Sequence, residues 1–243
     1  MESQSGWKEA WKSFAAEIDG RVITQPHNAR IRAQLGPYPI SFFSQHSRAI
    51  KGDSTSGNTL VFILDFFYSL LTGSNAYSGF NVSAPEMATT TVALPFISLT
   101  EFQFKAVVGK RDVLNPPPSK SGQTAGYAEL DQRVSFNTNN QLVLQQLRED
   151  IAVRNSLLSL EDYSIWIERK SLITSINMSS VPAGVNILAL KTAHLLGSPS
   201  ELSQTFNLFA RLMESMVALR LASGSDPHFR CELVHDVISR IGD

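Results

Sequence analysis

The sequence predicts an α+β fold: a mostly antiparallel β-sheet with an N-terminal helix, a central helix and C-terminal helices packed on one face. Between Arg21 and Lys191, apolar and polar residues repeatedly alternate with a period of two, as in half-buried strands. Amphipathic helical patterns bracket this region at both ends of the chain. Each predicted helix has one apolar stripe, so we expect all of them to cover the same sheet face.

The N-terminal half begins with a helix and continues as strands. Trp7, Trp11 and Phe14 fall at helical spacing and predict a helix over Trp7–Ile18 that ends near Gly20. The predicted strands that follow are Ala29–Leu35 with its arginines facing outward, Ile40–Ile50, Leu60–Leu70, Tyr77–Ala84 and Phe102–Val108. A helix is the alternative for Leu60–Leu70, because periodicity does not separate the two in a short apolar run.

A stretch rich in Pro, Gly and Ser at 115–126 predicts a linker or a long loop, because three consecutive prolines cannot join a central strand. The predicted division is an N-terminal helix plus antiparallel β subdomain at 1–114 and an α+β subdomain with the C-terminal helices at 127–243.

The second half has the order strand, helix, strands, helix. A central helix is predicted over Asn140–Ser156, with Asn139 as its cap. The predicted strands are Val134–Thr138, Tyr163–Ile167, Leu172–Met178 and Val185–Lys191. Ser198, Pro199 and Glu201 form a capping-box pattern that begins a helix over Pro199–Ser223. Asp226-Pro227 repeats the cap signal for a last helix over Pro227–Ile241.

The composition excludes several classes of function. The 243 residues have a net charge of -1 and no Lys/Arg run, so we expect no nucleic-acid partner. The longest apolar run, Leu60–Leu71, contains Asp65 and is shorter than the roughly 20 residues of a membrane span. The single cysteine forms no intramolecular disulfide, and residues 1–20 lack the apolar core of a secretory signal. We therefore expect a soluble, cytoplasmic protein.

The most specific metal-like pattern is His228, Cys231 and His235, which would share one face of a helix. Structural zinc sites bring paired ligands from two elements, and no second pair is present in the sequence. Cys231 also belongs to an ordinary apolar stripe with Val234 and Ile238, where a thiol is unreactive. These three residues are weak metal candidates only, and we predict no catalytic residue and no cofactor.

No phosphate-binding, dinucleotide-binding, nucleophile-elbow or zinc-protease motif is present in the sequence. Arg30 and Arg32, with nearby aromatic residues, raise the alternative of RNA on a sheet face. The basic aromatic strand that typifies such sheets is missing from the sequence.

The chain resembles a group of uncharacterised bacterial α+β proteins over about two-thirds of its length. The similar segments are the opening Trp helix with Gly20–Ile23, Leu64–Tyr68 with Tyr77 and Ala84-Pro85, Leu130–Phe136, Asn139-Asn140, and Leu147 through Leu158. The chain departs from the group at Leu130-Asp131 and Tyr77–Gly79, where a Phe-Asp pair and a Tyr-Thr-Arg sequence are expected. The resemblance implies no activity, and it implies that Asp65 and Asp131 form turns.

The first functional hypothesis is a non-enzymatic interaction or scaffold protein in an oligomer or complex. It assigns the contact to helix residues Phe206, Phe209 and Met213, because the chain has few charges and this helix is rich in Met and Phe. The alternative is a small-molecule or lipid-surface binding domain with a pocket wall made by Phe42, Phe43, Phe66, Phe67 and Tyr68. A third hypothesis is an unrecognised hydrolase that uses isolated histidines such as His27, His46 and His194.

Overall fold

The structure is a computed structural model, which describes residues 6–25, 28–47, 87–109, 128–168, 181–192 and 194–230. The chain divides into two compact units, one formed by Met1–Gln45 with Ala88–Asp243 and the other by His46–Met87. The second unit lies almost wholly outside the described residues, and the fold described below is that of the first.

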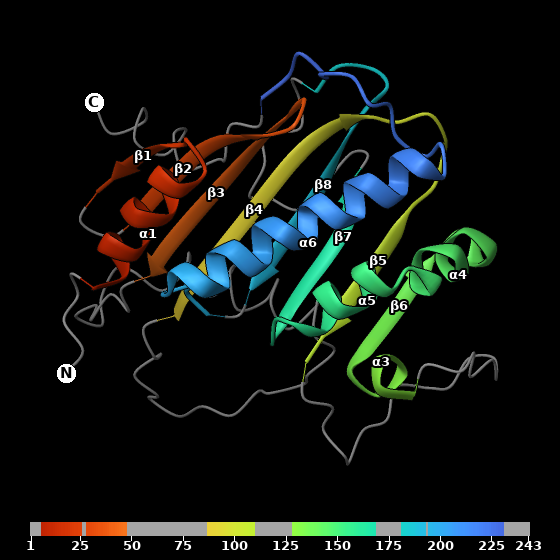
Figure 1. Ribbon diagram of the computed structural model, residues 1–243, viewed down its shortest axis with the longest axis horizontal. Helices are drawn as coiled ribbons and strands as arrows, with labels where there is room; N and C mark the ends of the chain where they lie inside the picture. The colour runs from red at the N-terminus through yellow and green to blue at the C-terminus, as the bar shows by residue number, and fades with distance from the viewer. Residues whose placement is uncertain are drawn as a thin grey trace, which may run out of the picture. The chain divides into compact units, whose positions relative to one another are not determined.

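An eight-stranded sheet forms the centre of this unit, with the strand order β1-β2-β3-β4-β8-β7-β5-β6 (Figure 1). The strands are β1 Arg21–Thr24, β2 Asn28–Leu35, β3 Tyr38–Ser47, β4 Met87–Ile97, β5 Phe104–Val108, β6 Val134–Thr138, β7 Tyr163–Glu168 and β8 Val185–Thr192. Every pair whose register is described is antiparallel. The predicted α+β class with a mostly antiparallel sheet is therefore confirmed.

The helices lie on one face of this sheet (Figure 1). They are α1 Gly6–Glu17, α3 Ala128–Arg133, α4 Gln141–Glu149, α5 Ile151–Leu158 and α6 Pro199–Ala218. Side chains from these helices share one hydrophobic core with strand residues such as Leu94 and Leu188, which are both fully buried. The arrangement of the helices on a single face is as the sequence predicts.

Alternation along the strands separates the two faces. On β4, Val92 and Leu94 belong to the core beneath the helices, whereas Ala93 belongs to a separate cluster on the opposite face. The register pairs Leu94 with Leu188 and Ala93 with Ala189, so residues that are paired on neighbouring strands lie on the same face of the sheet. The registers therefore give the face of each strand residue on either side of the β3–β4 junction, and the shared cluster of Phe43 with Ala93 joins the two sides.

A buried polar chain ties α1 to the middle of the sheet. The Trp11 indole Nε1–H donates to the Leu196 carbonyl at 2.8 Å. The Leu196 N–H donates to the Thr90 hydroxyl at 3.0 Å, and the Thr90 N–H donates to the Thr192 hydroxyl at 3.0 Å. These contacts satisfy polar groups that would otherwise be costly to bury. They join α1, β4, β8 and the segment that leads into α6.

Some elements differ from the prediction. The strands β1 and β4 and the short helix α3 are not predicted by periodicity. In β4, Thr90 through Phe96 are buried on both faces of the sheet, so no alternation marks this strand. The single predicted helix over Asn140–Ser156 is two helices, because Asp150 is in an extended conformation between α4 and α5.

The last predicted helices also differ. Helix α6 ends at Ala218 and not at Ser223, since Arg220 has a φ of 57° and the Leu221 N–H donates to the Met216 carbonyl at 2.8 Å. Residues 227–230 are not helical, and the rest of the predicted helix Pro227–Ile241 lies outside the described residues. The predicted strands Leu60–Leu70, Tyr77–Ala84 and Leu172–Met178 lie outside them as well.

The proposed linker at 115–126 also lies outside the described part of the chain. Strands from both sides of it, β4 and β5 before and β6 to β8 after, belong to one hydrogen-bonded sheet. The division into subdomains at 1–114 and 127–243 stays a prediction. No helix within the described ranges is long and apolar enough to cross a membrane.

The first prediction concerns the capping box at the start of α6. Ser198 accepts from the Glu201 N–H at 3.2 Å, and the Glu201 carboxylate accepts from the Ser198 N–H at 3.0 Å. Replacing Ser198→Ala should lower the free energy of unfolding by about 1 kcal/mol, because the N–H of Glu201 loses its acceptor. Urea denaturation measures the change. Ser200→Ala, an exposed position in the same turn, is the control and should cost almost nothing.

The second prediction concerns Asp150, which joins three helices. Its Oδ1 accepts from the Ala152 N–H at 2.8 Å, and its Oδ2 accepts from the Ser215 hydroxyl of α6. The Ser215 hydrogen bond holds the pKa of Asp150 below its ordinary value, with smaller contributions from the Val153 and Ala152 N–H groups and Arg211, against the opposing effect of burial. A lowered folded pKa contributes stability above the unfolded pKa, and that stability is lost as the pH falls through the folded value.

Asp150→Asn should therefore lower the free energy of unfolding by about 1 kcal/mol at neutral pH. The difference from the natural chain should shrink as the pH falls below the ordinary carboxyl pKa of 3.8. Urea denaturation between pH 7 and pH 2.5 gives both values. The exposed Glu161→Gln serves as control, and a loss that is independent of pH would show that the Asp150 charge is unimportant.

Candidate functional site

The candidate site is the sheet face opposite the helices, here called the helix-free face because no helix of the described ranges packs on it. The eight strands contain five Lys and Arg residues, and the registers place all of them on this face: Arg21, Arg30, Arg32, Lys105 and Lys191. The residues between them, such as Val22, Ile31 and Leu190, belong to or pack against the core on the helix side. Alternation thus concentrates the strand cations on one surface.

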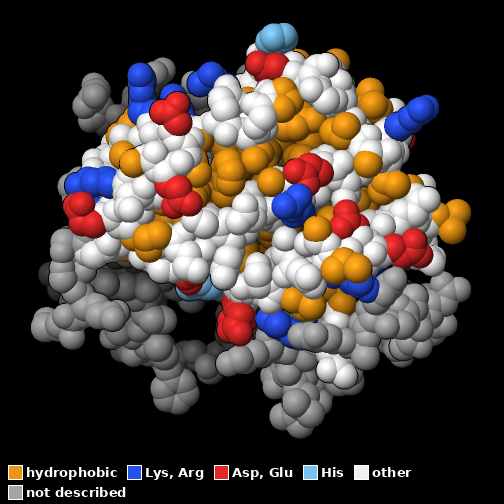
Figure 2. Space-filling model, viewed as in Figure 1, with side chains coloured by type: hydrophobic (Ala, Val, Ile, Leu, Met, Phe, Trp, Pro, Cys, Tyr) orange, Lys and Arg blue, Asp and Glu red, His pale blue; other side chains and the backbone are white. Residues whose placement is uncertain are grey.

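The two faces differ in charge. Glu168 is the only acidic residue in the eight strands, and it pairs with Ile187 at the last position of β7. On the helix side, acidic and basic side chains are interspersed (Figure 2), and Lys12–Glu9 and Arg211–Glu214 form ion pairs there. Among the strand residues, the helix-free face therefore carries five basic residues and one acidic residue, in a chain whose net charge is only -1.

Apolar and aromatic side chains accompany the cations. The Arg30 guanidinium lies 5.8 Å from the centre of the Phe43 ring, within cation–π distance. At the centre of the face, Phe43, Ala93, Ile187 and Ala189 form a small buried cluster, against which Trp166, Val181 and Phe229 pack. Toward the sides of the sheet, Ile23 is 47% exposed and Val107 is 40% exposed. The exposed large apolar side chains of this face, among the described residues, therefore lie toward the two edges of the sheet.

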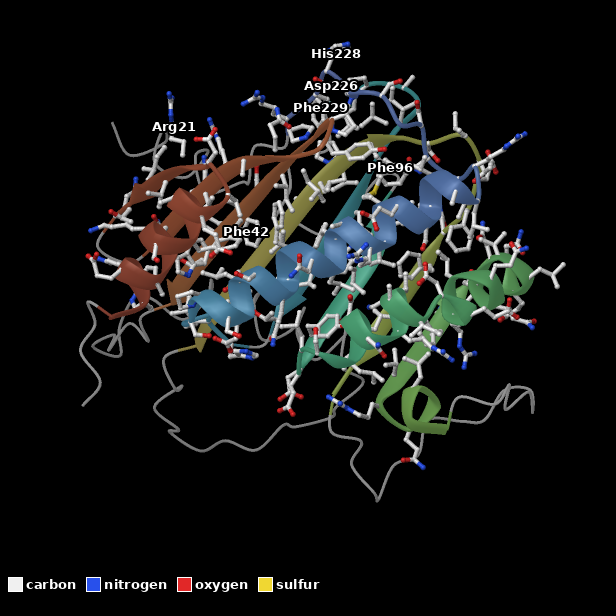
Figure 3. The ribbon with its side chains drawn as sticks, in the orientation of Figure 1. Arg21, Phe42, Phe96, Asp226, His228 and Phe229 are labelled. Atoms are coloured by element: carbon white, nitrogen blue, oxygen red, sulfur yellow. The ribbon has the colours of Figure 1, made fainter. Side chains whose placement is uncertain are left out.

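Arg21, Ile23, Arg30 and Arg32 form what we call the edge patch, on β1 and β2. Arg21 is directly opposite Arg32, and Ile23 is directly opposite Arg30. Arg21 is exposed, and Figure 3 shows it extending outward from the ribbon. No carboxylate in the described part of the chain forms an ion pair with Arg21 or Arg32. Two guanidinium groups in direct cross-strand opposition repel each other.

The predicted metal-like residues are only partly described. The His228 side chain is 89% exposed, with its Nδ1 3.7 Å from Asp226 Oδ2, and it lies at the periphery in Figure 3. Cys231 and His235 lie outside the described residues, so their combination with His228 stays a prediction. Within the described ranges, no group of three His, Cys, Asp or Glu residues is arranged to hold a metal ion.

The predicted interaction residues on α6 belong largely to the core. Phe209 and Met213 are 0% and 2% exposed, and Phe206 is partly buried with its ring 6.2 Å from Phe14. Two of the three side chains therefore pack inside the chain. A contact of these residues with a partner stays a prediction.

The aromatic pocket wall does not form from Phe42 and Phe43 together. Phe42 packs with Phe14 in the core at a ring distance of 5.4 Å, whereas Phe43 lies in the cluster on the helix-free face. Consecutive strand residues point to opposite faces, which is why the two rings separate. Phe66, Phe67, Tyr68 and Asp65 lie outside the described residues, as does the side chain of Asp131.

Three polar residues near the start of α6 have the residue types of a hydrolase site. His194 Nε2 lies 3.5 Å from Glu201 Oε1, while the Ser198 hydroxyl donates to Glu201 Oε2 at 2.8 Å. The serine is bonded to the carboxylate and not to the imidazole, so the histidine is not placed to activate it. Glu201 instead accepts hydrogen bonds from the backbone N–H groups of Gly197 and Ser198, as the glutamate of a capping box does.

The buried tyrosines act as hydrogen-bond donors. Tyr163 donates to the Leu157 carbonyl at 2.7 Å, and Tyr38 donates to the Ser223 carbonyl at 2.6 Å. Burial raises the pKa of both phenols above the ordinary value of 10.0. Both therefore stay protonated near neutral pH and join segments of the fold.

Comparison with known proteins identifies no family for this chain. No protein-family model, curated protein or solved structure matches the chain.

A third prediction follows from the opposition of Arg21 and Arg32. Arg32→Gln should raise the free energy of unfolding by about 0.5 kcal/mol at low ionic strength, because it relieves cross-strand repulsion. The gain should disappear in 1 M salt, where the screening length is about 3 Å. Urea denaturation at both salt concentrations measures it. Lys105→Gln is the control, because Lys105 is opposite Asn137 and Trp166 and not another cation; an equal salt-dependent gain there would contradict the explanation.

Proposed function

We propose that this chain is a non-enzymatic interaction or scaffold protein, soluble and cytoplasmic, that binds another protein through the helix-free face. The observation that carries the proposal is the placement of all five strand cations on this one face. Alternation requires polar residues there, but neutral or acidic residues would meet that requirement equally well. The bias toward Arg and Lys therefore supports a binding surface.

The composition of the accessible surface suits a protein contact. Arg is enriched at protein interfaces, where its planar group stacks and binds carboxylates in a bidentate manner. Exposed Ile23 and Val107 supply apolar area beside the cations. By contrast, the acidic groups Asp150 and Glu201 are engaged in helix caps. These side chains stabilise the fold, and the proposal assigns them no chemistry.

The proposal is tested by charge reversal at two separate places on the face. One variant combines Arg21→Glu with Arg32→Glu, and the other combines Lys105→Glu with Lys191→Glu. Each chain is used to capture proteins from a lysate of the source organism, and bound proteins are quantified by mass spectrometry. At least one double variant should lose a partner that the natural chain retains, by about tenfold or more, since each 1.4 kcal/mol of binding free energy is a factor of ten.

A control makes one charge reversal of the same kind elsewhere. Arg220→Glu alters an exposed arginine just after α6, outside the helix-free face, and should leave capture unchanged. Circular dichroism and light scattering of every variant verify folding and oligomeric state. If the natural chain and both double variants retain the same proteins in the same amounts, the proposed function is wrong.

A further inference from the structure

We infer that the edge patch recognises an acidic segment of the partner protein, in which an acidic residue lies two positions from an apolar one. This inference rests on the proposed function and adds the place of contact and the chemistry of the partner. The edge patch places one exposed apolar residue, Ile23, beside the opposed guanidinium groups of Arg21 and Arg32, so a complementary partner presents an apolar side chain beside a carboxylate.

The spacing within the patch defines the complement. Arg21 and Ile23 are two residues apart on β1, and side chains at such positions lie about 7 Å apart on the same face. Arg32 is opposite Arg21, so two guanidinium groups stand together at one end of the patch. A carboxylate placed between them can bind both and relieve their repulsion. An apolar side chain two residues along the same extended segment would then reach Ile23.

The position of the patch favours access. Strand β1 is at the end of the strand order, and Ile23 is among the most exposed large apolar side chains of the described residues. Strand β1 has only four residues, which makes extended backbone pairing with another strand unfavourable. Recognition is therefore expected through side chains.

An acidic polypeptide fits better than a nucleic acid. Proteins that bind single strands place exposed aromatic rings where bases stack, and the edge patch has no aromatic residue. The Phe43 ring, which lies against Arg30, is 8% exposed. The net charge of -1 also gives no long-range attraction for a phosphate backbone. Charge complementarity at this patch is local, as it is in a protein contact.

Site-specific photocrosslinking tests the inference in cells of the source organism. The photoreactive residue p-benzoylphenylalanine replaces Ile23 in one chain, Val107 in a second and Leu142 in a third. Val107 is on the helix-free face away from the patch, and Leu142 is 76% exposed on α4. The Ile23 probe should crosslink a protein whose modified peptide is acidic. Adding Arg21→Gln and Arg32→Gln should reduce this product about tenfold, whereas adding Arg220→Gln should not.

The outcomes separate this inference from the proposed function. A partner crosslinked from Val107 but not from Ile23 overturns the edge patch and leaves the helix-free face as the binding surface. An Ile23 product that is not acidic, or that does not respond to the two arginine substitutions, also overturns the inference alone. Crosslinks to nucleic acid, or protein crosslinks from Leu142 only, overturn both proposals.

Discussion

The packing of α6 on the central strands β4 and β8 is the interaction on which the rest of the structure depends. Buried α6 side chains such as Phe209 and Met216 meet Leu94 and Leu188 in one core. Each fully buried side chain of this kind contributes about 1.5–3 kcal/mol relative to exposure. Once these strand residues face the helix, the pleat fixes the opposite direction for their neighbours. A register shift of one residue in β8 would turn Leu188 and Leu190 away from the helix side and Lys191 toward it, so packing against the helices also fixes this register.

The cationic face follows from this constraint only in part. A lysine or arginine beneath the helices would lose its hydration without a compensating partner, so strand cations must lie on the other face. That requirement says nothing about the sign of the charge. Nevertheless, five of the six charged strand residues are basic, and the one acidic residue, Glu168, is at the end of β7. This predominance of basic residues is the part that folding leaves unexplained, and it is the observation on which the proposed binding rests.

Elements with a period of two, a clear cap or a turn signal at their start could be predicted from the sequence, whereas β4, which is buried on both faces, could not. Strands β2, β7 and β8 and the start of α6 lie close to their predicted positions. Strand β4 gives no alternating signal, because its residues are buried on both sides. The outward direction of Arg30 and Arg32 was visible from alternation. The sequence did not show that Arg21, Lys105 and Lys191 lie on the same face as these two residues. Strand order and register depend on contacts between residues far apart in the sequence.

The proposed binding at the edge patch would be coupled to the stability of the sheet edge. On the helix side, cations such as Lys12 and Arg211 have carboxylates within their own helices, so those charges are compensated in the free chain. Arg21 and Arg32 oppose each other across β1 and β2 instead. Their repulsion raises the free energy of the free chain and is removed when carboxylates bind between them. In the proposed complex, the pair that weakens the isolated sheet edge would therefore strengthen the contact, and this difference between the two states favours an acidic partner over a neutral one.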